Sequence, residues 1–232
     1  EASAYTALAR LHDAGLAIIL ITGRPAGWCD LIARLWPVDA VVGENGALTM
    51  RYDHVARRMH ARYWLSEAER RDARSRLTAV AERILRDVPA AAIASDQGYR
   101  ACDLAIDVAE DVAALPAEAV ERILGIFSAS GATAKLSSIH VNGWFGDWDK
   151  LTMTRRLFRE HYGVELEAVR ETCVYVGDSP NDAPMFAYFP LSVGVANVRR
   201  FTGLMDHLPA YVTAQASGAG FVAVAQALMA TR

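Results

Sequence analysis

The sequence contains little cysteine and lacks long hydrophobic runs, and these two shortages exclude several classes of protein. Its three cysteines, Cys29, Cys102 and Cys173, lie far apart and form no C-x-x-C pair. This usage is typical of buried thiols in a reducing compartment and argues against a disulfide framework or a zinc site. No apolar run approaches the roughly 18 residues that cross a membrane. We therefore expect a cytoplasmic protein with no membrane partner.

The sequence also lacks a strong excess of either charge. It has 24 lysines and arginines against 27 aspartates and glutamates, which gives a net charge of −3. This balance offers no electrostatic reason to expect a nucleic acid or an anionic membrane as a partner. Hydrophobic residues make up 53% of the 232 positions, enough for one large domain or two smaller ones. No G-x-G-x-x-G motif follows an expected strand, which disfavours a dinucleotide-binding domain.

Hydrophobic patterning predicts alternating strands and helices at both ends of the sequence. Helical spacing from Ser3 ends at Gly15, and a continuous apolar run follows, as in a strand covered on both faces. The expected strands of these parts are residues 16–21, 40–42, 174–176, 191–195 and 210–213. Helical patterns separate them, and the order strand, helix, strand predicts parallel pairing. We therefore expect an α/β domain built on a parallel sheet.

Residues 48–146 show a different pattern. A hairpin is expected over residues 48–63, and a capping box at Ser66 and Glu69 begins a long helix. Further strand patterns lie at residues 91–94, 101–108 and 133–141, and a second helix is expected over residues 116–131. This order predicts an antiparallel sheet with helices on one face. We expect residues 48–146 to form an α+β module inserted into the α/β domain, which comprises residues 1–47 and 147–232.

Polar side chains follow the carboxyl ends of the expected parallel strands. Thr22 follows one strand, Asp178 and Asp182 follow another, and Lys150 lies at the module boundary. Because ligand chemistry in an open parallel sheet gathers at the carboxyl ends of the strands, we expect these groups to lie close together. Two carboxylates suit Mg²⁺, and a hydroxyl and an ammonium beside them suit the charge that accumulates in phosphoryl transfer.

Each of these residues also has a simpler interpretation. Thr22 or Asn181 could be a helix N-cap, Lys150 a solvated lysine, and Asp182 a partner of a helix dipole. A lysine at the start of a helix is mildly unfavourable, which weakens the simple interpretation of Lys150. Taken together, the four groups favour a site over unrelated coincidences.

Four motifs occur in order along the sequence, namely residues 21–24 (ITGR), 44–47 (ENGA), Lys150 and 177–182 (GDSPND). Together they resemble the motifs of the haloacid dehalogenase-like phosphatases. More narrowly, the sequence resembles the branch with a large cap inserted after the second core motif, which includes Cof-type, sucrose-phosphate and mannosyl-3-phosphoglycerate phosphatases. The resemblance implies a Rossmann-like core with a parallel sheet and an inserted α+β cap of the C2B type. It also implies Mg²⁺-dependent hydrolysis of a small phosphorylated metabolite through an aspartyl-phosphate intermediate.

The resemblance implies roles for individual residues as well. Asp178 would bind Mg²⁺ directly, and Asp182 would support the metal or orient Lys150. Thr22 would hydrogen-bond the phosphoryl group, Lys150 would neutralise it, and Asn45 would brace the loop near the cap hinge. With two residues of the cap added, the expected substrate contacts are Thr22, Gly23, Arg24, Asn45, His140, Asn142, Lys150 and Asn181.

One motif of this family, an Asp-x-Asp-x-Thr turn after the first strand, does not occur in the sequence. In the family it supplies the attacking aspartate and the general acid/base. Neither Asp13 nor Asp30 replaces it, because each lies in or beside an expected helix and has no acid two residues on. We expect the motif upstream of Glu1, since without its strand a buried parallel sheet would keep unpaired backbone groups. The alternative is a binding module that has lost its nucleophile.

Substrate cues are expected where the inserted module returns to the core. His140, Asn142, Trp144, Phe145 and Trp148 cluster there. Aromatic faces beside polar groups could stack on a sugar ring, and the alternative is a packing cluster between domains. We expect a phosphorylated sugar as substrate and a monomer or homodimer, with a phosphomutase of the same chemistry as the alternative enzyme.

Overall fold

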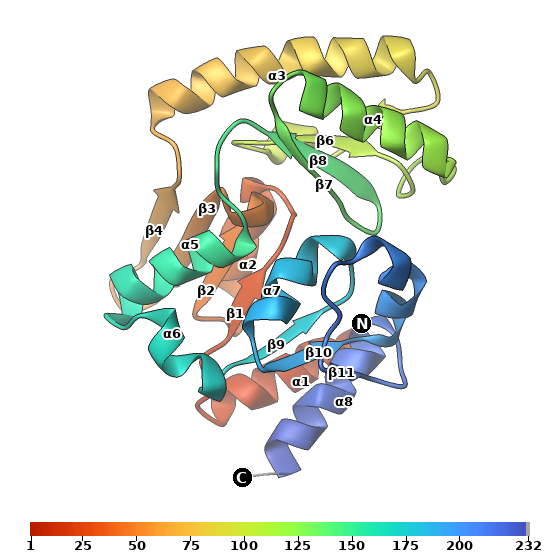
Figure 1. Ribbon diagram of the computed structural model, residues 1–232. Helices are drawn as coiled ribbons and strands as arrows, with labels where there is room; N and C mark the ends of the chain where they lie inside the picture. The colour runs from red at the N-terminus through yellow and green to blue at the C-terminus, as the bar shows by residue number, and fades with distance from the viewer. Residues whose placement is uncertain (231–232) are drawn as a thin grey trace.

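The strands of the computed structural model, which describes residues 1–230, form three sheets (Figure 1). The first has the order β1 (Ile19–Ile21), β2 (Ala40–Gly43), β3 (Leu48–Asp53) and β4 (Arg58–Tyr63). The second has the order β11 (Tyr211–Val212), β10 (Leu191–Gly194) and β9 (Val174–Gly177). The third has the order β5 (Ala92–Ile93), β6 (Leu104–Asp107), β8 (His140–Trp144) and β7 (Thr133–Leu136).

Helices alternate with these strands along the chain. The α-helices are α1 (Ala2–Asp13), α2 (Ala26–Leu35), α3 (Glu67–Asp87), α4 (Ala117–Ala129), α5 (Lys150–Leu157), α6 (Leu166–Val169), α7 (Ala183–Tyr188) and α8 (Ser217–Ala230). The 3-10 turns are η1 (Glu44–Gly46), η2 (Gln97–Tyr99), η4 (Arg170–Thr172), η5 (Pro180–Asp182) and η6 (Ala196–Leu204), and the π-helix η3 (Phe158–Tyr162) extends α5. Within the described part of the chain, no helix has the length and apolar character needed to cross a membrane.

Two groups of parallel strands form the core, as the patterning predicts. β1 pairs in parallel with β2, and β10 pairs in parallel with both β9 and β11. β2 is buried on both faces: Val41 joins the cluster that contains Ile32 of α2, whereas Val42 packs with Met153 and Leu157 of α5. Helices therefore cover both sides of this sheet, which explains why β2 is entirely apolar. The expected strand over residues 16–21 is shorter, because β1 begins only at Ile19.

The hairpin β3–β4 belongs to the same sheet as β1 and β2. β3 pairs antiparallel with β2, and β4 pairs antiparallel with β3. Leu48 and Met50 of β3 are buried in the same cluster as Val41, so the apolar face of the hairpin completes the core. Residues 48–63, which the sequence pattern assigns to the inserted module, therefore lie in the core sheet.

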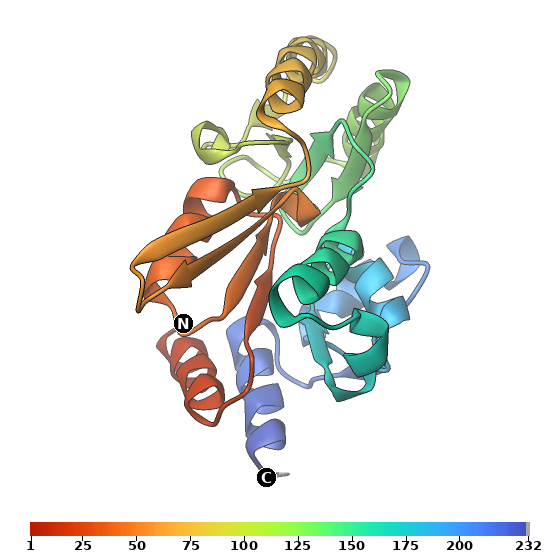
Figure 2. The ribbon, with the colours of Figure 1, turned by 90° about the vertical axis from the view of Figure 1, so that its left-hand side faces the viewer.

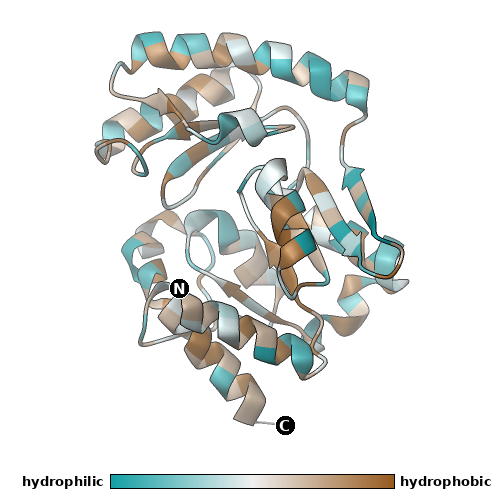
Figure 3. Ribbon diagram, turned by 180° about the vertical axis from the view of Figure 1, so that it is seen from behind, coloured by the Kyte–Doolittle hydropathy of each residue, from teal (hydrophilic) through white to brown (hydrophobic). Residues whose placement is uncertain are grey.

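Residues 64–146 build a separate layer beside the core (Figures 1 and 2). Its sheet is antiparallel, and α3 and α4 cover one face of it. Fully buried members of their shared cluster are Ile84, Ile106, Ile123, Phe127 and Val141. At Gly143 any Cβ would overlap the Phe127 ring, so glycine allows the close approach of α4 to β8. Hydrophilic residues are frequent along α3, at the top of the molecule (Figure 3).

The strand expected over residues 133–141 is two strands. β7 and β8 pair antiparallel, and a tight turn at Ser137 joins them. The Ser137 N–H donates to the His140 carbonyl oxygen (2.8 Å), and the His140 N–H donates to Ser137 Oγ (3.0 Å). Because the turn contains neither glycine nor proline, the pattern gave no sign of it.

Candidate active site

Loops at the carboxyl ends of β1 and β9 meet at one edge of the core. Thr22 directly follows β1, and Asp178 directly follows β9. Asn45, in the η1 turn after β2, joins the two loops. Its N–H donates to the Thr22 carbonyl oxygen (3.1 Å), and its Oδ1 accepts from Asn181 Nδ2 (3.0 Å). Three segments that are distant in the sequence thus form one polar site, in the position where parallel sheets bind ligands.

The η1 turn has an unusual backbone. Glu44, Asn45 and Gly46 have φ angles of 46°, 54° and 107°, in the left-handed region that disfavours residues other than glycine. Gly46 is required here, because any Cβ would overlap the Asp149 carbonyl oxygen. The turn therefore packs directly against the residue before Lys150 and fixes where α5 begins.

Lys150, the first residue of α5, is buried and forms a short ion pair. Asp149 caps the helix by accepting a hydrogen bond from the Thr152 N–H (2.7 Å). Lys150 Nζ lies 2.6 Å from Asp182 Oδ1, and only 7% of Lys150 is exposed. A buried ammonium at the positive end of a helix is unfavourable, so Asp182 is what stabilises it in this position.

Both oxygens of the Asp182 carboxylate accept hydrogen bonds from the protein. Oδ1 accepts from Lys150 and from Tyr175 Oη (2.7 Å). Oδ2 accepts from the N–H groups of Asp178 (2.9 Å) and Ser179 (3.2 Å). Burial opposes ionisation, but Lys150 and these hydrogen bonds outweigh it and lower the pKa of Asp182. Asp182 is therefore an ionised partner of Lys150.

Asp178 is the carboxylate that fits a metal ion. Its Oδ2 accepts a hydrogen bond from Asn197 Nδ2 (2.8 Å), and burial, followed by the charge of Asp182, raises its pKa. A partly buried carboxylate suits Mg²⁺, which one or two carboxylates, water and a substrate phosphate can hold. Asp182, the other expected ligand, accepts hydrogen bonds at both oxygens. Its role as a metal ligand stays a prediction. Among residues 1–230, no group of three or more His, Cys, Asp or Glu side chains could hold a metal ion.

Thr22 and Asn45, which the loops of this site bring together, are both able to donate hydrogen bonds to a ligand. Thr22 Oγ1 accepts from the Arg24 N–H (3.0 Å), so its own hydrogen remains available. Asn45 Nδ2 is buried and has no hydrogen-bond partner within the described residues. A buried amide donor of this kind costs free energy unless a ligand accepts from it. Together with Lys150, these donors suit an oxyanion.

Arg24 and Gly23 lie in a second polar network, where the core meets the layer of residues 64–146. Arg24 pairs with Glu110 (2.7 Å) and with Asp96 (3.3 Å). Arg100 Nη1 donates to the Gly23 carbonyl oxygen (2.9 Å). Both residues, expected as substrate contacts, are thus engaged with the neighbouring layer in this structure.

His140 and Asn142 form the other side of the same network. His140 Nε2 lies 2.9 Å from Glu110 Oε2, and Asn142 Nδ2 donates to Asp103 Oδ2 (2.9 Å). Burial, followed by the charge of Arg100, lowers the pKa of His140. The two residues are two positions apart on β8, so their side chains lie on the same face of the sheet. Their contacts place them at the junction between the layers.

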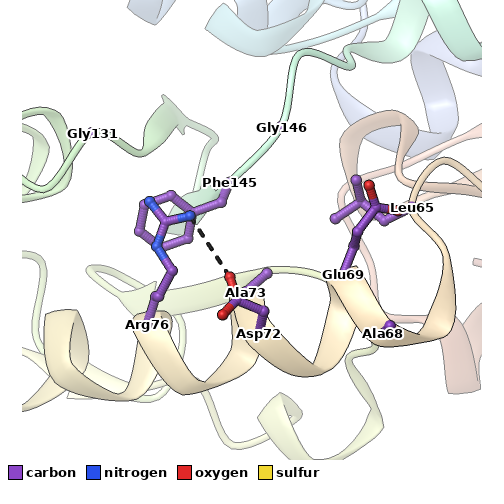
Figure 4. A pocket seen from close by; sticks show the side chains of 9 residues that line it. All are labelled: Leu65, Ala68, Glu69, Asp72, Ala73, Arg76, Gly131, Phe145 and Gly146. Atoms are coloured by element: carbon purple, nitrogen blue, oxygen red, sulfur yellow. Dashed lines mark ion pairs between the residues drawn. The ribbon is translucent and has the colours of Figure 1, made fainter.

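The aromatic residues near the end of the inserted module serve packing. Trp144 and Trp148 stack with their ring centroids 6.0 Å apart and are only 1% and 2% exposed. Phe145 lies under the Arg76 guanidinium and lines an open pocket of about 570 Å³ along α3 (Figure 4). Because the tryptophan faces are covered, the packing interpretation holds for them and sugar stacking does not.

Two residues of the site escaped prediction from the sequence. Tyr175 lies within the apolar pattern of β9, yet its hydroxyl hydrogen-bonds Asp182. Asn197 follows β10 much as Asp178 follows the neighbouring parallel strand β9. A search for polar residues after every expected parallel strand would have identified Asn197 but not Tyr175.

Comparison with known proteins assigns the fold. No protein-family model and no curated protein matches the sequence. Solved structures do match, and they cover nearly the whole chain. A Thermoplasma acidophilum protein has a TM-score of 0.70 and 17% identity, over 99% of this chain and 90% of that chain. The sucrose-phosphatase of Synechocystis sp. PCC6803, solved with sucrose and phosphate, has a TM-score of 0.64 and 15% identity, over 98% and 91%. A sugar phosphatase of haloacid dehalogenase subclass IIB has a TM-score of 0.62 and 15% identity, over 99% and 92%.

This chain therefore has the fold of the haloacid dehalogenase superfamily. Sugar phosphatases are among the structures that share this fold with it. The fold predicted from the four motifs is confirmed.

Proposed function

We propose that this protein is a Mg²⁺-dependent phosphatase that hydrolyses the phosphate monoester of a small metabolite, a sugar phosphate. The observation that carries the proposal is the Lys150–Asp182 pair, which adjoins Asp178 at the carboxyl end of a parallel strand and is joined through Asn45 to Thr22. Phosphoryl transfer needs mainly positioning and charge stabilisation, which an ammonium, a hydroxyl and a carboxylate supply. The fold shared with a sucrose-phosphatase supports the substrate class.

Each residue of the site would have a distinct task. Lys150 would neutralise the phosphoryl oxygens while Asp182 holds its ammonium in place. Thr22 Oγ1 and Asn45 Nδ2 would donate hydrogen bonds to the same oxygens. Asp178 would hold Mg²⁺, which when bound supplies further positive charge to the phosphate.

The attacking carboxylate would come from a further strand. Among the described strands, β1 and β9 lie at the ends of their sheets, so each has one edge without a paired strand. Ile21 of β1 packs against the cluster around Tyr175 of β9, so the two edges are neighbours. We propose that a parallel strand joins these edges and brings an aspartate to Lys150. Its carboxylate oxygen would attack phosphorus as the ester P–O bond breaks and the leaving oxygen takes up a proton. Water would then cleave the acyl phosphate and restore the carboxylate.

A steady-state assay tests the function. A form of the protein that includes the proposed strand is supplied with Mg²⁺ and with sugar phosphates or p-nitrophenyl phosphate. We expect faster release of inorganic phosphate from a sugar phosphate than from p-nitrophenyl phosphate, lost with EDTA and restored by Mg²⁺. Isomerised sugar phosphate without free phosphate would indicate a phosphomutase. Binding without turnover would indicate a binding module and refute the enzyme.

We also propose a division into a core and a cap. The cap would comprise residues 64–146, and the core would include residues 48–63, because the hairpin pairs with β2. We also propose a cytoplasmic location, which the three free cysteines support, and a monomer or homodimer. Light scattering of the purified protein would decide between one copy and two.

A further inference from the structure

Glu44 connects the core to the cap through one buried carboxylate. Its Oε1 accepts from the N–H groups of Ala26 and Ala101 (2.8 Å each). Its Oε2 accepts from Cys102 (2.6 Å) and Asp103 (3.2 Å). Ala26 begins α2 in the core, whereas the other three residues form a cap loop before β6. One fully buried core side chain is therefore the acceptor for three successive amides of the cap.

The cap loop has a second attachment close by. The side chain of Arg100 is fully buried, donates to the Gly23 carbonyl oxygen, and pairs with Asp96 and Asp103 at 3.0 Å each. Because two carboxylates already pair with Arg100, the negative charge of Glu44 is stabilised mainly by its backbone N–H donors. Several charge-assisted hydrogen bonds are what allow a carboxylate to be buried.

Glu44 also adjoins the residues that form the site. Its N–H donates to the Arg24 carbonyl oxygen (3.1 Å), and Asn45 follows it directly. The loop that carries Thr22 ends at α2, whose first residue Ala26 is held by the same carboxylate. Positive φ angles at Glu44 and Asn45 persist only where the surroundings enforce them, and the four hydrogen bonds to Glu44 provide that enforcement.

We propose that Glu44 is a positioning residue: it docks the cap loop onto the core and thereby holds Asn45 and Thr22 where they meet the phosphoryl group. The docking stands on geometry alone, whereas the effect on the phosphoryl group rests on the proposed function. A glutamine fits the same space, but its amide nitrogen would face at least one pair of N–H donors. Those buried donors would lose their acceptor.

NMR of the full chain tests the docking, at about pH 8, above the pKa near 7 of Glu44, where the carboxylate is ionised. In the wild type, the amide protons of Ala101 and Cys102 should resonate downfield and exchange slowly, although they lie outside helices and strands. In Glu44→Gln, at least one donor pair should shift upfield and exchange roughly tenfold faster, because a lost hydrogen bond of this size corresponds to that factor. Glu160→Gln, which changes a surface glutamate, should leave these amides unchanged.

Two outcomes would overturn the docking. One is a folded Glu44→Gln variant whose cap-loop amides keep the wild-type shifts and exchange rates. The other needs only the wild type and decides the matter even if the variant does not fold: fast exchange of the cap-loop amides. Exchange as slow as that of core strands supports the docking.

Kinetics of the active form test the positioning. Glu44→Gln should lower kcat by roughly tenfold or more, with a smaller change in KM, because the phosphoryl contacts are misplaced and not removed. An unchanged kcat in a variant whose amides have lost their acceptor would refute the positioning role. An inactive wild type would refute the proposed function, and the NMR result would still stand.

Discussion

The ion pair between Lys150 and Asp182 determines the position of the positive charge in the site. Each is almost fully buried, and the two atoms that meet are 2.6 Å apart. Removal of one partner from such a pair leaves an uncompensated charge, so the pair is retained as a unit. Tyr175 and two backbone N–H groups hold Asp182 in place, so they also fix the carboxylate oxygen that the Lys150 ammonium meets.

Lys150→Met should abolish most of the activity. The substitution keeps the length of the side chain and removes the charge that would meet the phosphoryl oxygens. We expect kcat/KM to fall by about 100-fold or more in a phosphate-release assay. Lys135→Met is the matched control, because Lys135 is the only other lysine of the sequence and is exposed on β7. Equal losses in both variants, or full activity of Lys150→Met, would contradict the role of Lys150.

At the scale of elements, the η1 turn determines where α5 begins. The turn follows β2 without a linker, and its glycine packs against the carbonyl group of the residue that caps α5. A displacement of the turn would therefore move Lys150. The position of the ammonium thus depends on backbone packing as well as on charge.

Gly46→Ala should destabilise the protein and displace α5. Alanine would have to adopt a φ angle of 107° and would meet the Asp149 carbonyl oxygen. We expect the free energy of unfolding to fall by about 2–3 kcal/mol in urea titrations. Gly125→Ala in α4 meets no atom within 4 Å and should raise the free energy of unfolding by about 0.5–1 kcal/mol. A Gly46→Ala variant as stable as the wild type would show that the turn tolerates a side chain.

At the scale of the whole molecule, the ion pairs near the junction of the core with residues 64–146 are of unequal worth. Arg24 pairs with Glu110 across the junction, whereas Arg100 pairs with Asp96 and Asp103 within residues 64–146 and reaches the core through its hydrogen bond to the Gly23 carbonyl oxygen. Arg24 and Glu110 are about 30% exposed, whereas the Arg100 side chain is fully buried. Exposed pairs contribute little to stability because water and salt screen them, and breaking a buried pair leaves its partners unpaired. The stability of the molecule therefore depends on the ion pairs of Arg100 more than on the Arg24–Glu110 pair.

Paired variants test this inequality. Glu110→Gln should change the free energy of unfolding by less than about 1 kcal/mol. Arg100→Met should lower it by about 3–5 kcal/mol, because Asp103 would stay buried without its cation and Asp96 would keep only its longer pair with Arg24. Chemical denaturation monitored by tryptophan fluorescence gives both values. Equal effects of the two substitutions would refute the ranking.

The stability of the whole molecule should also depend on the protonation of Glu44. Burial, followed by the charge of Asp103, raises the pKa of Glu44 from 4.5 to about 7, although its backbone hydrogen bonds oppose this. The folded state therefore holds the proton more tightly than the unfolded state. Protonation of Glu44 therefore contributes to the free energy of unfolding. The contribution is complete below pH 4.5 and is lost as the pH rises through about 7. Other titratable or charged groups close to Glu44 are Cys29, Tyr63, Arg100, Cys102 and Asp103.

Unfolding at a series of pH values checks this dependence. Between about pH 5 and pH 8, the free energy of unfolding of the wild type should fall relative to that of Glu44→Gln, by at most about 3 kcal/mol. Curves that run parallel over this range would show that Glu44 titrates alike in the folded and unfolded states.

Features that depend on neighbouring residues could be predicted from the sequence, whereas contacts between residues far apart in the sequence could not. Thr22 and Asp178 could be predicted because each directly follows an apolar strand, a relation that adjacent residues reveal. The contact of Asn45 with Asn181 joins positions 136 residues apart, so no local pattern reports it. Tyr175 was hidden because an aromatic residue in a strand has the pattern of core packing. The sequence pattern places the hairpin of residues 48–63 in the inserted module, whereas its pairing with β2 places it in the core sheet. Strand pairing over a distance decides the sheet to which a hairpin belongs, and a local pattern does not report it.

Because Cys102 is buried at the junction between the layers, the rate at which a thiol reagent labels it would report how often the junction opens. Its thiol lies in the cap loop that Glu44 holds, is 4% exposed, and has a pKa that burial raises. A thiol reagent needs an exposed thiolate, so Cys102 should react only while the cap loop is away from the core. Cys173, which is partly exposed, provides an internal reference. The ratio of the two labelling rates would thus measure how often the molecule opens, without any substrate.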